Sequence, residues 1–346
     1  MEPTLYPKAA GEAAELDWIE IRFEVEEALH GYRVDRFLQA RITRLSRTRI
    51  QSIIGTGALR FEGGASIRRA SARVRAGDVL ILRRPAPDEP AVPMHYEEIY
   101  RDEVLMIIDK PSGLPVHPTA RYHRNTLTAL MRTREGAEHG WQMAHRIDRE
   151  TSGVLALARG AAVKSRRQPP SPAGVLKRSF ARRDVHKEYL AITRGLLEAP
   201  LSIETPLGFD PQSTISIKMG AVAVEDGGAP ARTDVEPLAT SSFRGEPITL
   251  VRAIPHTGRQ HQIRIHLALE GRPLLGDKLY GVDEHLFRDM ADGLMTMQEV
   301  SEAVGLPRQA LHAHVLELPH PVGGRRMRFE SPWPPLLAEV ITCPSG

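Results

Sequence analysis

Apolar and polar residues alternate along residues 18–25 of the chain, and this period of two predicts a half-buried β-strand. Apolar residues then recur at helical spacing, which predicts an amphipathic helix with one buried stripe. The residues of this stripe are Val34, Phe37, Leu38 and Ile42. The positions off the stripe carry arginines, namely Arg33, Arg36, Arg41 and Arg44.

The segment that follows predicts a second helix and two more strands. Ser46 has the side chain of a helix N-cap, and the apolar pattern after it ends at Gly55 and Gly57. We expect a strand to begin in residues 58–61, and residues 73–82 contain a turn followed by a strand. Together these elements form a small α+β unit.

Four prolines fall within residues 84–93, where no hydrophobic periodicity is present. Such a composition is typical of an extended, semi-rigid tether between folded parts. We therefore expect four parts: an N-terminal tail at 1–17, a first unit at 18–84, a linker at 85–95 and a second unit at 96–346.

The second unit mixes strands and helices. Thr257 and Gln260 have the spacing of a capping box, which predicts a helix start, and Gly271 is suited to end that helix. In such a helix Gln260 and Arg264 lie on one side, at i and i+4. Strands are predicted at 103–110, at the apolar run 154–158 and at 186–195.

The composition of the 346 residues, 41% hydrophobic and 26% charged, is that of an ordinary globular protein with more than one domain. Cys343 is the single cysteine, so the sequence holds neither a disulfide framework nor a thiolate metal site. The N-terminus has no secretory signal pattern, and no apolar run approaches the roughly 18 residues of a membrane span. We expect a cytoplasmic protein without membrane attachment.

Charge is distributed unevenly along the chain, although the formal net charge is only +3. Residues 1–30 carry a balance of −6, whereas residues 31–84 contain 13 arginines against 3 acids. Residues 160–188 carry 8 basic residues against 2 acids. Two basic blocks in a nearly neutral chain indicate a polyanionic partner, and the plainer alternative is that the arginines only solvate two surfaces.

Residues 145–153 read HRIDRETSG and contain the most distinctive chemistry of the chain. Asp148 lies between Arg146 and Arg149, and a carboxyl group among fixed positive charges stays ionised near neutral pH. Such a carboxylate can act as a nucleophile or as a general base. By charge pattern alone, a solvated cluster of ion pairs beside a strand is the more common arrangement.

The longer string HRIDRETSGVLALAR, at 145–159, resembles the active-site motif of the RluA-type pseudouridine synthases, whose usual form is HRLDRxTSGLLLLAK. Ile147 and Arg159 are conservative departures from that form. Three other segments resemble motifs of the same family. They are KPSGLPVH at 110–117, HKEYLAITRG at 186–195, and TGRQHQIRIHL at 257–267, in which Gln260 replaces a threonine.

The resemblance covers about residues 18–84 and 96–337 and implies an enzyme that isomerises uridine to pseudouridine in structured RNA. It implies that Asp148 is the catalytic nucleophile or base, that Tyr189 stacks on the target base and helps with proton transfer, and that Arg264 pairs with Asp148. The implied fold class is α+β, with a catalytic domain built on a mixed, largely antiparallel sheet with flanking helices. The isomerisation involves no redox change, so we expect no cofactor and no metal.

The first unit resembles the RNA-binding module named after the fourth protein of the small ribosomal subunit, which often precedes this catalytic domain. The resemblance rests on RVDRFL, SRTRIQSIIGTGALRF and VRAGDVLIL, and Glu62 departs from the usual turn of that module. By the habit of the family, this module favours ribosomal RNA over transfer RNA as the substrate, and we expect the protein to be a monomer. The residues expected to contact RNA are Arg33, Arg36, Arg44, Arg47, Arg49, His145, Arg146, Arg149 and Arg259.

Three alternatives remain open at this level. The chain could be a catalytically silent RNA-binding or ribosome-assembly factor, although the intact motif residues argue against it. A metal-dependent hydrolase would need a ligand set, and the five-residue spacing of His256, His261 and His266 does not place them on one helix face. The basic, proline-rich segment 165–174 is predicted to be a loop that either touches RNA or is a solvated insertion.

Overall fold

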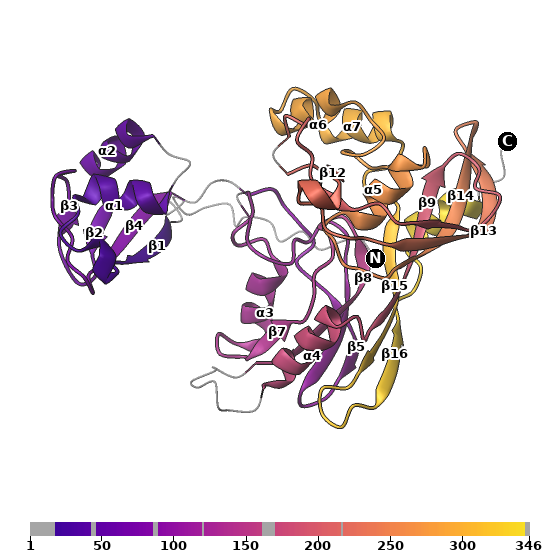
Figure 1. The fold of residues 1–346 in the computed structure, drawn as a ribbon, viewed down its shortest axis with the longest axis horizontal. Helices are drawn as coiled ribbons and strands as arrows, with labels where there is room; N and C mark the ends of the chain where they lie inside the picture. The colour runs from indigo at the N-terminus through magenta and orange to yellow at the C-terminus, as the bar shows by residue number, and fades with distance from the viewer. Residues whose placement is uncertain are drawn as a thin grey trace, which may run out of the picture. The chain divides into compact units, whose positions relative to one another are not determined.

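The computed structural model describes residues 18–42, 46–85, 89–119, 121–160, 170–215 and 217–342. The chain divides into two compact units at residues 88 and 89, and each is described by itself here (Figure 1). Residues 1–17 of the predicted tail lie outside the described residues. Residues 89–95, within the predicted linker, pack against the second unit: Val92 and Met94 contact its core, and the Glu89 carboxylate accepts a hydrogen bond from the N–H of Asn125.

The first unit is a four-stranded antiparallel sheet with two helices. Its strands, in sheet order, are β1 (Trp18–Glu24), β4 (Val79–Pro85), β2 (Leu59–Phe61) and β3 (Ser66–Ile67). The helical elements are η1 (Glu27–Leu29), α1 (Val34–Arg41) and α2 (Arg47–Gly55). The predicted stripe of α1 forms the core with Ile50 and Ile54, and the Ser46 hydroxyl accepts from the N–H of Arg49 at 3.3 Å. These two helices were predicted from the hydrophobic pattern, and both are confirmed.

The second unit is built on a ten-stranded sheet. β15 and β8 pair in parallel and all its other pairings are antiparallel, which confirms the expected mixed, largely antiparallel sheet. The main strand order is β10 (Leu201–Ile203), β13 (Thr233–Phe243), β14 (Glu246–Pro255), β9 (His186–Arg194), β15 (Leu311–Pro319), β8 (Ser152–Arg159), β6 (Leu105–Lys110) and β5 (Glu97–Arg101). β16 (Arg326–Glu330) pairs with β15, β7 (Trp141–Met143) pairs with β8, and β11 (Leu207–Phe209) and β12 (Met219–Ala221) form a separate hairpin.

Helices cover both faces of this sheet. Alternate residues of β8 enter different cores: Leu155 and Leu157 pack with α3, whereas Val154 and Ala156 pack with α4. A strand that is buried on both faces needs apolar residues at every position, which explains the uninterrupted run after Ser152. The helical elements are α3 (Leu127–Glu135), α4 (Pro172–Ala181), η2 (Val224–Asp226), α5 (Gln262–Leu269), α6 (Glu284–Ala291), α7 (Met297–Val304) and α8 (Pro335–Thr342).

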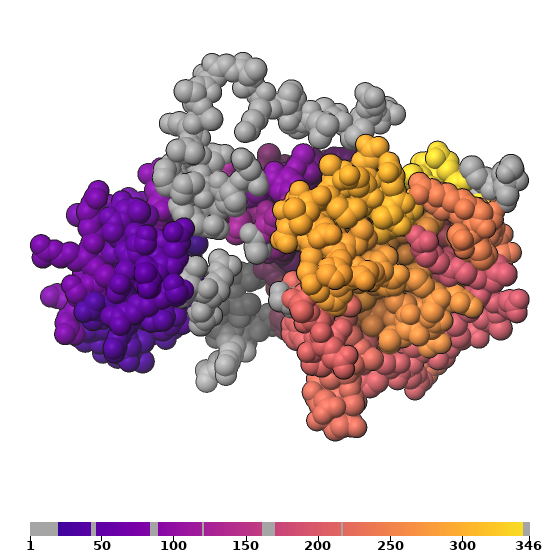
Figure 2. Space-filling view, turned by 90° about the horizontal axis from the view of Figure 1, so that it is seen from above, coloured from indigo at the N-terminus to yellow at the C-terminus, as the bar shows by residue number. Residues whose placement is uncertain are grey.

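α6 and α7 lie side by side on the surface of the second unit, where Figure 2 shows them in orange. No helix in the described part of the chain combines the length and the apolar character needed to cross a bilayer.

Two details of the helices differ from the sequence predictions. α5 begins at Gln262, after His261 as N-cap, so Thr257 and Gln260 do not form its capping box and Gln260 is not on its face. The reason is that the Gln262 side chain accepts from the Thr257 hydroxyl and from the N–H of Arg259, which holds the preceding turn outside the helix. The predicted end of the helix is confirmed, because Gly271 follows it with φ of +68°.

The second difference concerns the predicted basic loop at 165–174. Its residues up to 169 lie outside the described residues, but its end is helical rather than a loop. The Ser171 hydroxyl accepts from the N–H of Gly174 at 3.2 Å, and Pro172 is the first residue of α4. Proline is well tolerated there because the first helical N–H has no acceptor within the helix.

One glycine allows the parallel pairing in the middle of the sheet. Gly153 has φ of +110°, and a Cβ atom built on it would lie 2.1 Å from the carbonyl oxygen of Ala313 in β15. Only glycine permits this approach of the two backbones. The pairing fixes the start of β8, four residues after Asp148.

Gly153→Ala should lower the free energy of unfolding by about 2–6 kcal/mol, the sum of backbone strain and a steric clash. Gly245→Ala is a matched control, because Gly245 has φ of +80° and nothing within 4 Å of its Cβ position. The control should cost only about 1–2 kcal/mol of strain. Urea denaturation of both variants measures the difference. Equal losses would show that the close approach to Ala313 is not a constraint.

Candidate active site

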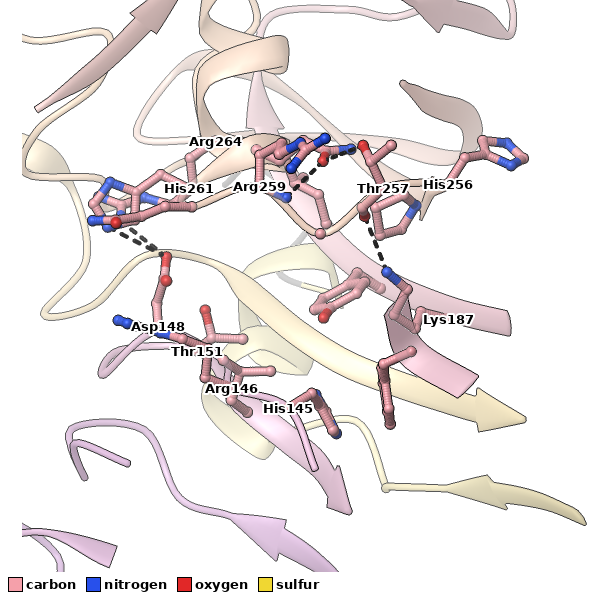
Figure 3. Close-up of a pocket in the computed structure, with 18 of the residues that line it drawn as sticks. His145, Arg146, Asp148, Thr151, Lys187, His256, Thr257, Arg259, His261 and Arg264 are labelled. Carbon is pink, nitrogen blue, oxygen red and sulfur yellow. Dashed lines mark hydrogen bonds and ion pairs between the residues drawn. The ribbon is translucent and has the colours of Figure 1, made fainter. Parts of the chain in front are cut away.

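A cavity of about 580 Å³ opens on the second unit where four segments of the chain meet (Figure 3). Its walls come from residues 145–148 before β8, residues 180–183 at the end of α4, the start of β9, and residues 255–264, which lead into α5. Because β8 and β9 both flank β15 in the centre of the sheet, segments that are distant in sequence converge at one place.

Asp148 lies in the loop between β7 and β8, and its backbone carbonyl accepts from the N–H of Thr151. Its side chain is 20% exposed. The Oδ2 atom accepts a hydrogen bond from Nη1 of Arg264 at 3.1 Å, and it lies 4.0 Å from Nε2 of His261. Figure 3 shows the carboxylate pointing toward these two side chains. The resemblance implied the contact with Arg264, which local sequence spacing could not show.

Arg264 is held by a second carboxylate. Its Nε and Nη2 donate to the two oxygens of Asp277 at 2.7 and 2.9 Å, a bidentate pair that is almost fully buried. Oδ1 of Asp277 also accepts from the N–H groups of Leu279 and Tyr280, and the guanidinium lies 4.9 Å from the centre of the Tyr280 ring. Two of the guanidinium nitrogens are therefore fixed, and Nη1 is left to aim at Asp148.

These contacts keep Asp148 ionised. Burial raises the pKa of Asp148, but the positive charges of Arg264 and Arg146 and the hydrogen bond from Arg264 lower it, as does His261 when its ring is protonated, and the net pKa is below its usual range. Burial lowers the pKa of His261 to about 4, so at neutral pH this ring is uncharged and the two arginines carry the effect. Asp148 is therefore a carboxylate anion at neutral pH, as a nucleophile or base requires.

Tyr189 lies on β9, opposite Ala313 of β15, and lines the cavity. Its ring packs on two apolar clusters, one that contains residues of α3 and one that contains residues of α5, while Ile192 belongs to a separate cluster with residues of α8. Burial and the charge of Asp148 raise the pKa of the Tyr189 hydroxyl well above its ordinary value. The group is a neutral phenol on an aromatic wall of the cavity.

Basic side chains surround the cavity. Arg146 is exposed on its wall, and Arg259 lines it while its Nε donates to the carbonyl of Pro230. Lys187, which the sequence reasoning did not single out, also lines it and donates to the carbonyl of Thr257 at 3.0 Å. Burial and the neighbouring Arg183 lower the pKa of Lys187 to about 8. The signal for Lys187 was its place in the motif at 186–195, two residues before Tyr189.

Two residues predicted to contact RNA make contacts within the protein, and their role toward RNA stays a prediction. The His145 ring stacks on Phe180 at 4.4 Å, and its Nε2 accepts from the N–H of Ala156, so its pKa of about 3, lowered by burial, leaves it neutral. Arg149 donates to the Tyr122 hydroxyl and to Glu150 and does not line the cavity.

The loop that carries Asp148 is braced from behind. Lys110 is fully buried and donates to three carbonyls, one of which belongs to Arg149, so it braces this loop. Glu150 forms an ion pair with Lys278 at 2.8 Å. Asp277 and Lys278 are neighbours in one turn. This turn therefore binds Arg264 through Asp277 and binds the Asp148 loop through Lys278. No feature of the local sequence around this turn indicated its charged contacts.

The predicted RNA-contacting residues of the first unit differ in their surroundings. Arg33 and Arg47 both donate to the buried carboxylate of Asp35. Arg36 and Arg49 are exposed. Arg44 lies outside the described residues.

The three histidines near α5 point to different partners. His256 contacts Asp234, His261 contacts the Tyr280 hydroxyl, and His266 contacts Thr233 and the carbonyl of Thr205. Within the described ranges, no group of three or more His, Cys, Asp or Glu side chains is placed to hold a metal ion.

Comparison with known proteins gives a consistent result. Residues 104–269 match the family described as RNA pseudouridylate synthase. The chain is 31% identical over 323 residues to the ribosomal large subunit pseudouridine synthase D of Zymomonas mobilis, covering 89% of this chain and 92% of that protein. It is 32% identical to the protein of the same name from Pseudomonas aeruginosa, covering 92% and 93%. Human RNA pseudouridylate synthase domain containing 1 superposes with a TM-score of 0.53 at 25% identity, covering 72% of this chain and 89% of that one.

Asp277→Asn should lower the free energy of unfolding at pH 7 by about 3–5 kcal/mol, because it leaves the buried Arg264 without its counter-charge. Burial raises the pKa of Asp277, but Arg264 lowers it more, so the folded-state pKa is below the ordinary 3.8. The stabilisation by this carboxylate is complete above the ordinary pKa and is lost as the pH falls through the folded-state pKa. The difference in stability between wild type and variant should therefore shrink on acidification.

Urea denaturation at pH 7 and at pH 3 measures this difference. Asp292→Asn, which changes an exposed aspartate at the end of α6, is the control and should leave stability nearly unchanged at both pH values. A difference for Asp277→Asn that is the same at both pH values would contradict the assignment.

Proposed function

The chain belongs to the RluA-type family of RNA pseudouridine synthases, and from this premise we propose that it converts specific uridines of large-subunit ribosomal RNA to pseudouridine with Asp148 as the catalytic residue. The observation that carries the proposal is the ionised Asp148 carboxylate, aimed into a basic cavity by Arg264 at 3.1 Å. The relatives named as ribosomal large subunit enzymes support the class of RNA.

The proposed reaction needs a carboxylate that acts as a nucleophile or as a proton acceptor, and an aromatic surface on which the uracil ring can stack. The bond between the sugar and nitrogen 1 of uracil breaks, the base turns, and a bond between the sugar and carbon 5 forms, while carbon 5 loses its proton and nitrogen 1 gains one. Asp148 begins this sequence either by attacking the sugar or by removing a sugar proton. The overall change is an isomerisation, so no electrons are gained or lost and no redox cofactor takes part.

The target base has to leave its stack to enter the cavity. We propose that the neutral ring of Tyr189 stacks on the extruded base, which offsets on the order of 1–3 kcal/mol of the cost. The hydroxyl of Tyr189 retains its proton at neutral pH, and we propose that it helps with proton transfer at the turning base. Arg146 and Arg259 are suited to hold the flanking phosphates, since guanidinium groups bind phosphate oxygens well.

We propose that the first unit is an RNA-binding module that directs the enzyme to ribosomal rather than transfer RNA. The 13 arginines of residues 31–84 and the exposed side chains of Arg36 and Arg49 support this role. An enzyme of this kind is expected to act as a monomer in the cytoplasm, where its RNA substrate is found.

Asp148→Asn should lower the rate of pseudouridine formation by at least about 10³-fold, because it removes the charge of the reacting carboxylate at constant size. RNA affinity should change little, since other residues hold the RNA. Pseudouridine mapping in cells that carry either the wild-type gene or this variant measures the rate effect and identifies the RNA. Asp292→Asn is the control and should be fully active.

A variant that still modifies RNA at the wild-type rate would contradict the role of Asp148. Loss of pseudouridines in transfer RNA alone would contradict the proposed substrate.

Replacing Arg36 and Arg49 together by glutamine should weaken RNA binding and flatten the salt dependence of log affinity by up to about two in slope, one for each lost phosphate contact. The same pair replaced by lysine keeps both charges and is the matched control, with the wild-type slope. Binding titrations of ribosomal RNA at several salt concentrations give these slopes. An unchanged slope in the glutamine variant would mean that these arginines only solvate the surface.

A further inference from the structure

His261 and Tyr280 form a second pair of side chains beside the Asp148 carboxylate. Nδ1 of His261 is 2.8 Å from the Tyr280 hydroxyl oxygen, and Nε2 is 4.0 Å from Oδ2 of Asp148. The two rings meet edge to face, with centres 5.6 Å apart and planes at 71°. Figure 3 shows His261 on the wall toward which Asp148 points. The histidine thus connects a buried phenol to the reacting carboxylate.

The hydrogen bonds of Tyr280 define which nitrogen of His261 carries the proton. The Tyr280 oxygen already accepts from the N–H of Met219 at 3.2 Å, so its own O–H is the group that needs an acceptor. Among the described residues, the Tyr280 hydroxyl makes one further contact, with Nδ1 of His261. If Tyr280 donates to Nδ1, the single proton of the neutral ring is on Nε2, and this N–H faces Asp148.

The backbone holds the ring in this position at a cost. His261 has φ of +57° and ψ of 16°, the left-handed conformation that few residues other than glycine adopt. Such a conformation costs about 1–2 kcal/mol and persists only where the surroundings impose it. Its carbonyl accepts from the N–H of Ile265 at 3.0 Å, which fixes the residue at the start of α5.

The separation of 4.0 Å between Nε2 and Oδ2 is too long for a direct hydrogen bond, but one oxygen atom at about 2.8 Å from each would bridge them. That oxygen must accept from the N–H of His261 and donate to the carboxylate of Asp148. A hydroxyl group can do both, whereas a uracil carbonyl only accepts and would place its lone pairs against the carboxylate.

In an RNA chain the 3′ and 5′ oxygens of an internal nucleotide are esterified, so its free hydroxyl is the 2′-hydroxyl. We propose that His261 and Asp148 together bind the 2′-hydroxyl of the target nucleotide, and that Tyr280 is a positioning residue that keeps the proton on Nε2 of His261. The inference rests on the proposed function. This contact would make the site selective for ribose over deoxyribose, because it recognises the hydroxyl on carbon 2′, which is next to the carbon 1′ whose bond to the base is exchanged.

The test compares two substrates and two enzymes. The substrates are one RNA with either ribose or 2′-deoxyribose at the target uridine alone, which isolates the hydroxyl. His261→Asn is suited to the left-handed backbone, and its amide reaches the position of Nδ1 but not that of Nε2. The preference of each enzyme for the ribose substrate is measured as a ratio of kcat/KM, and the ratio of the two preferences cancels the intrinsic reactivity of the deoxy substrate.

The wild type should prefer ribose about tenfold more strongly than His261→Asn does, the effect of one hydrogen bond in a closed site. His261→Gln, whose amide nitrogen reaches the position of Nε2, should recover part of that preference, and a structural role of His261 would not produce this recovery. Equal preferences in the wild type and His261→Asn would overturn the inference. A wild type that makes no pseudouridine on the ribose substrate would instead refute the proposed function.

Tyr280→Phe tests the positioning role separately, because it keeps the ring beside Arg264 and removes only the hydroxyl. Nitrogen NMR of the protein with labelled histidine should show His261 protonated at Nε2 in the wild type and a mixture of both tautomers in Tyr280→Phe. This readout needs neither RNA nor turnover and remains available if His261→Asn does not fold. A wild-type ring with its proton on Nδ1 would overturn the inference.

Discussion

The arrangement of the active site depends on how one guanidinium group is shared between two carboxylates. Asp277 takes two nitrogens of Arg264 in a bidentate pair and is itself held by two backbone N–H groups, so the third nitrogen can only aim at Asp148. An arginine bound by Asp148 alone would leave this carboxylate and its counter-charge on two flexible side chains. We call the bidentate pair of Asp277 and Arg264 the clamp. It fixes the positive charge of Arg264 from the buried core, and the exclusion of water by the surrounding residues strengthens the attraction between Arg264 and Asp148.

The clamp is effective because the turn that carries Asp277 also holds the loop that carries Asp148. Asp277 binds Arg264 of α5, and its neighbour Lys278 binds Glu150, two residues after Asp148. Lys110 adds a bond to the carbonyl of Arg149 from the opposite direction. Two buried charges in one turn therefore fix the distance between the helix and the loop, and this distance decides whether Arg264 and Asp148 meet.

The sheet supplies the frame for these contacts. β8 and β9 flank β15 near its centre, so the Asp148 loop and Tyr189 are delivered side by side from segments about forty residues apart in sequence. The parallel pairing of β8 with β15 requires Gly153, since any side chain there would meet the backbone of the neighbouring strand. The centre of the sheet thus positions Asp148 and Tyr189, while basic side chains line the walls of the cavity.

The sequence by itself determined the elements and the chemistry of the individual segments. Periods of two and of 3.6 predicted the strands and helices of the first unit, the continuous apolar run predicted the doubly buried β8, and the motif around Asp148 indicated the family. These features are local, because burial patterns and caps act over a few residues. Only the tertiary structure decided that His145 is a stacked, neutral support, that α5 starts at Gln262, and that Asp277 and Tyr280 orient Arg264 and His261. Such contacts join residues far apart in sequence, and their strength comes from burial, which no local pattern specifies.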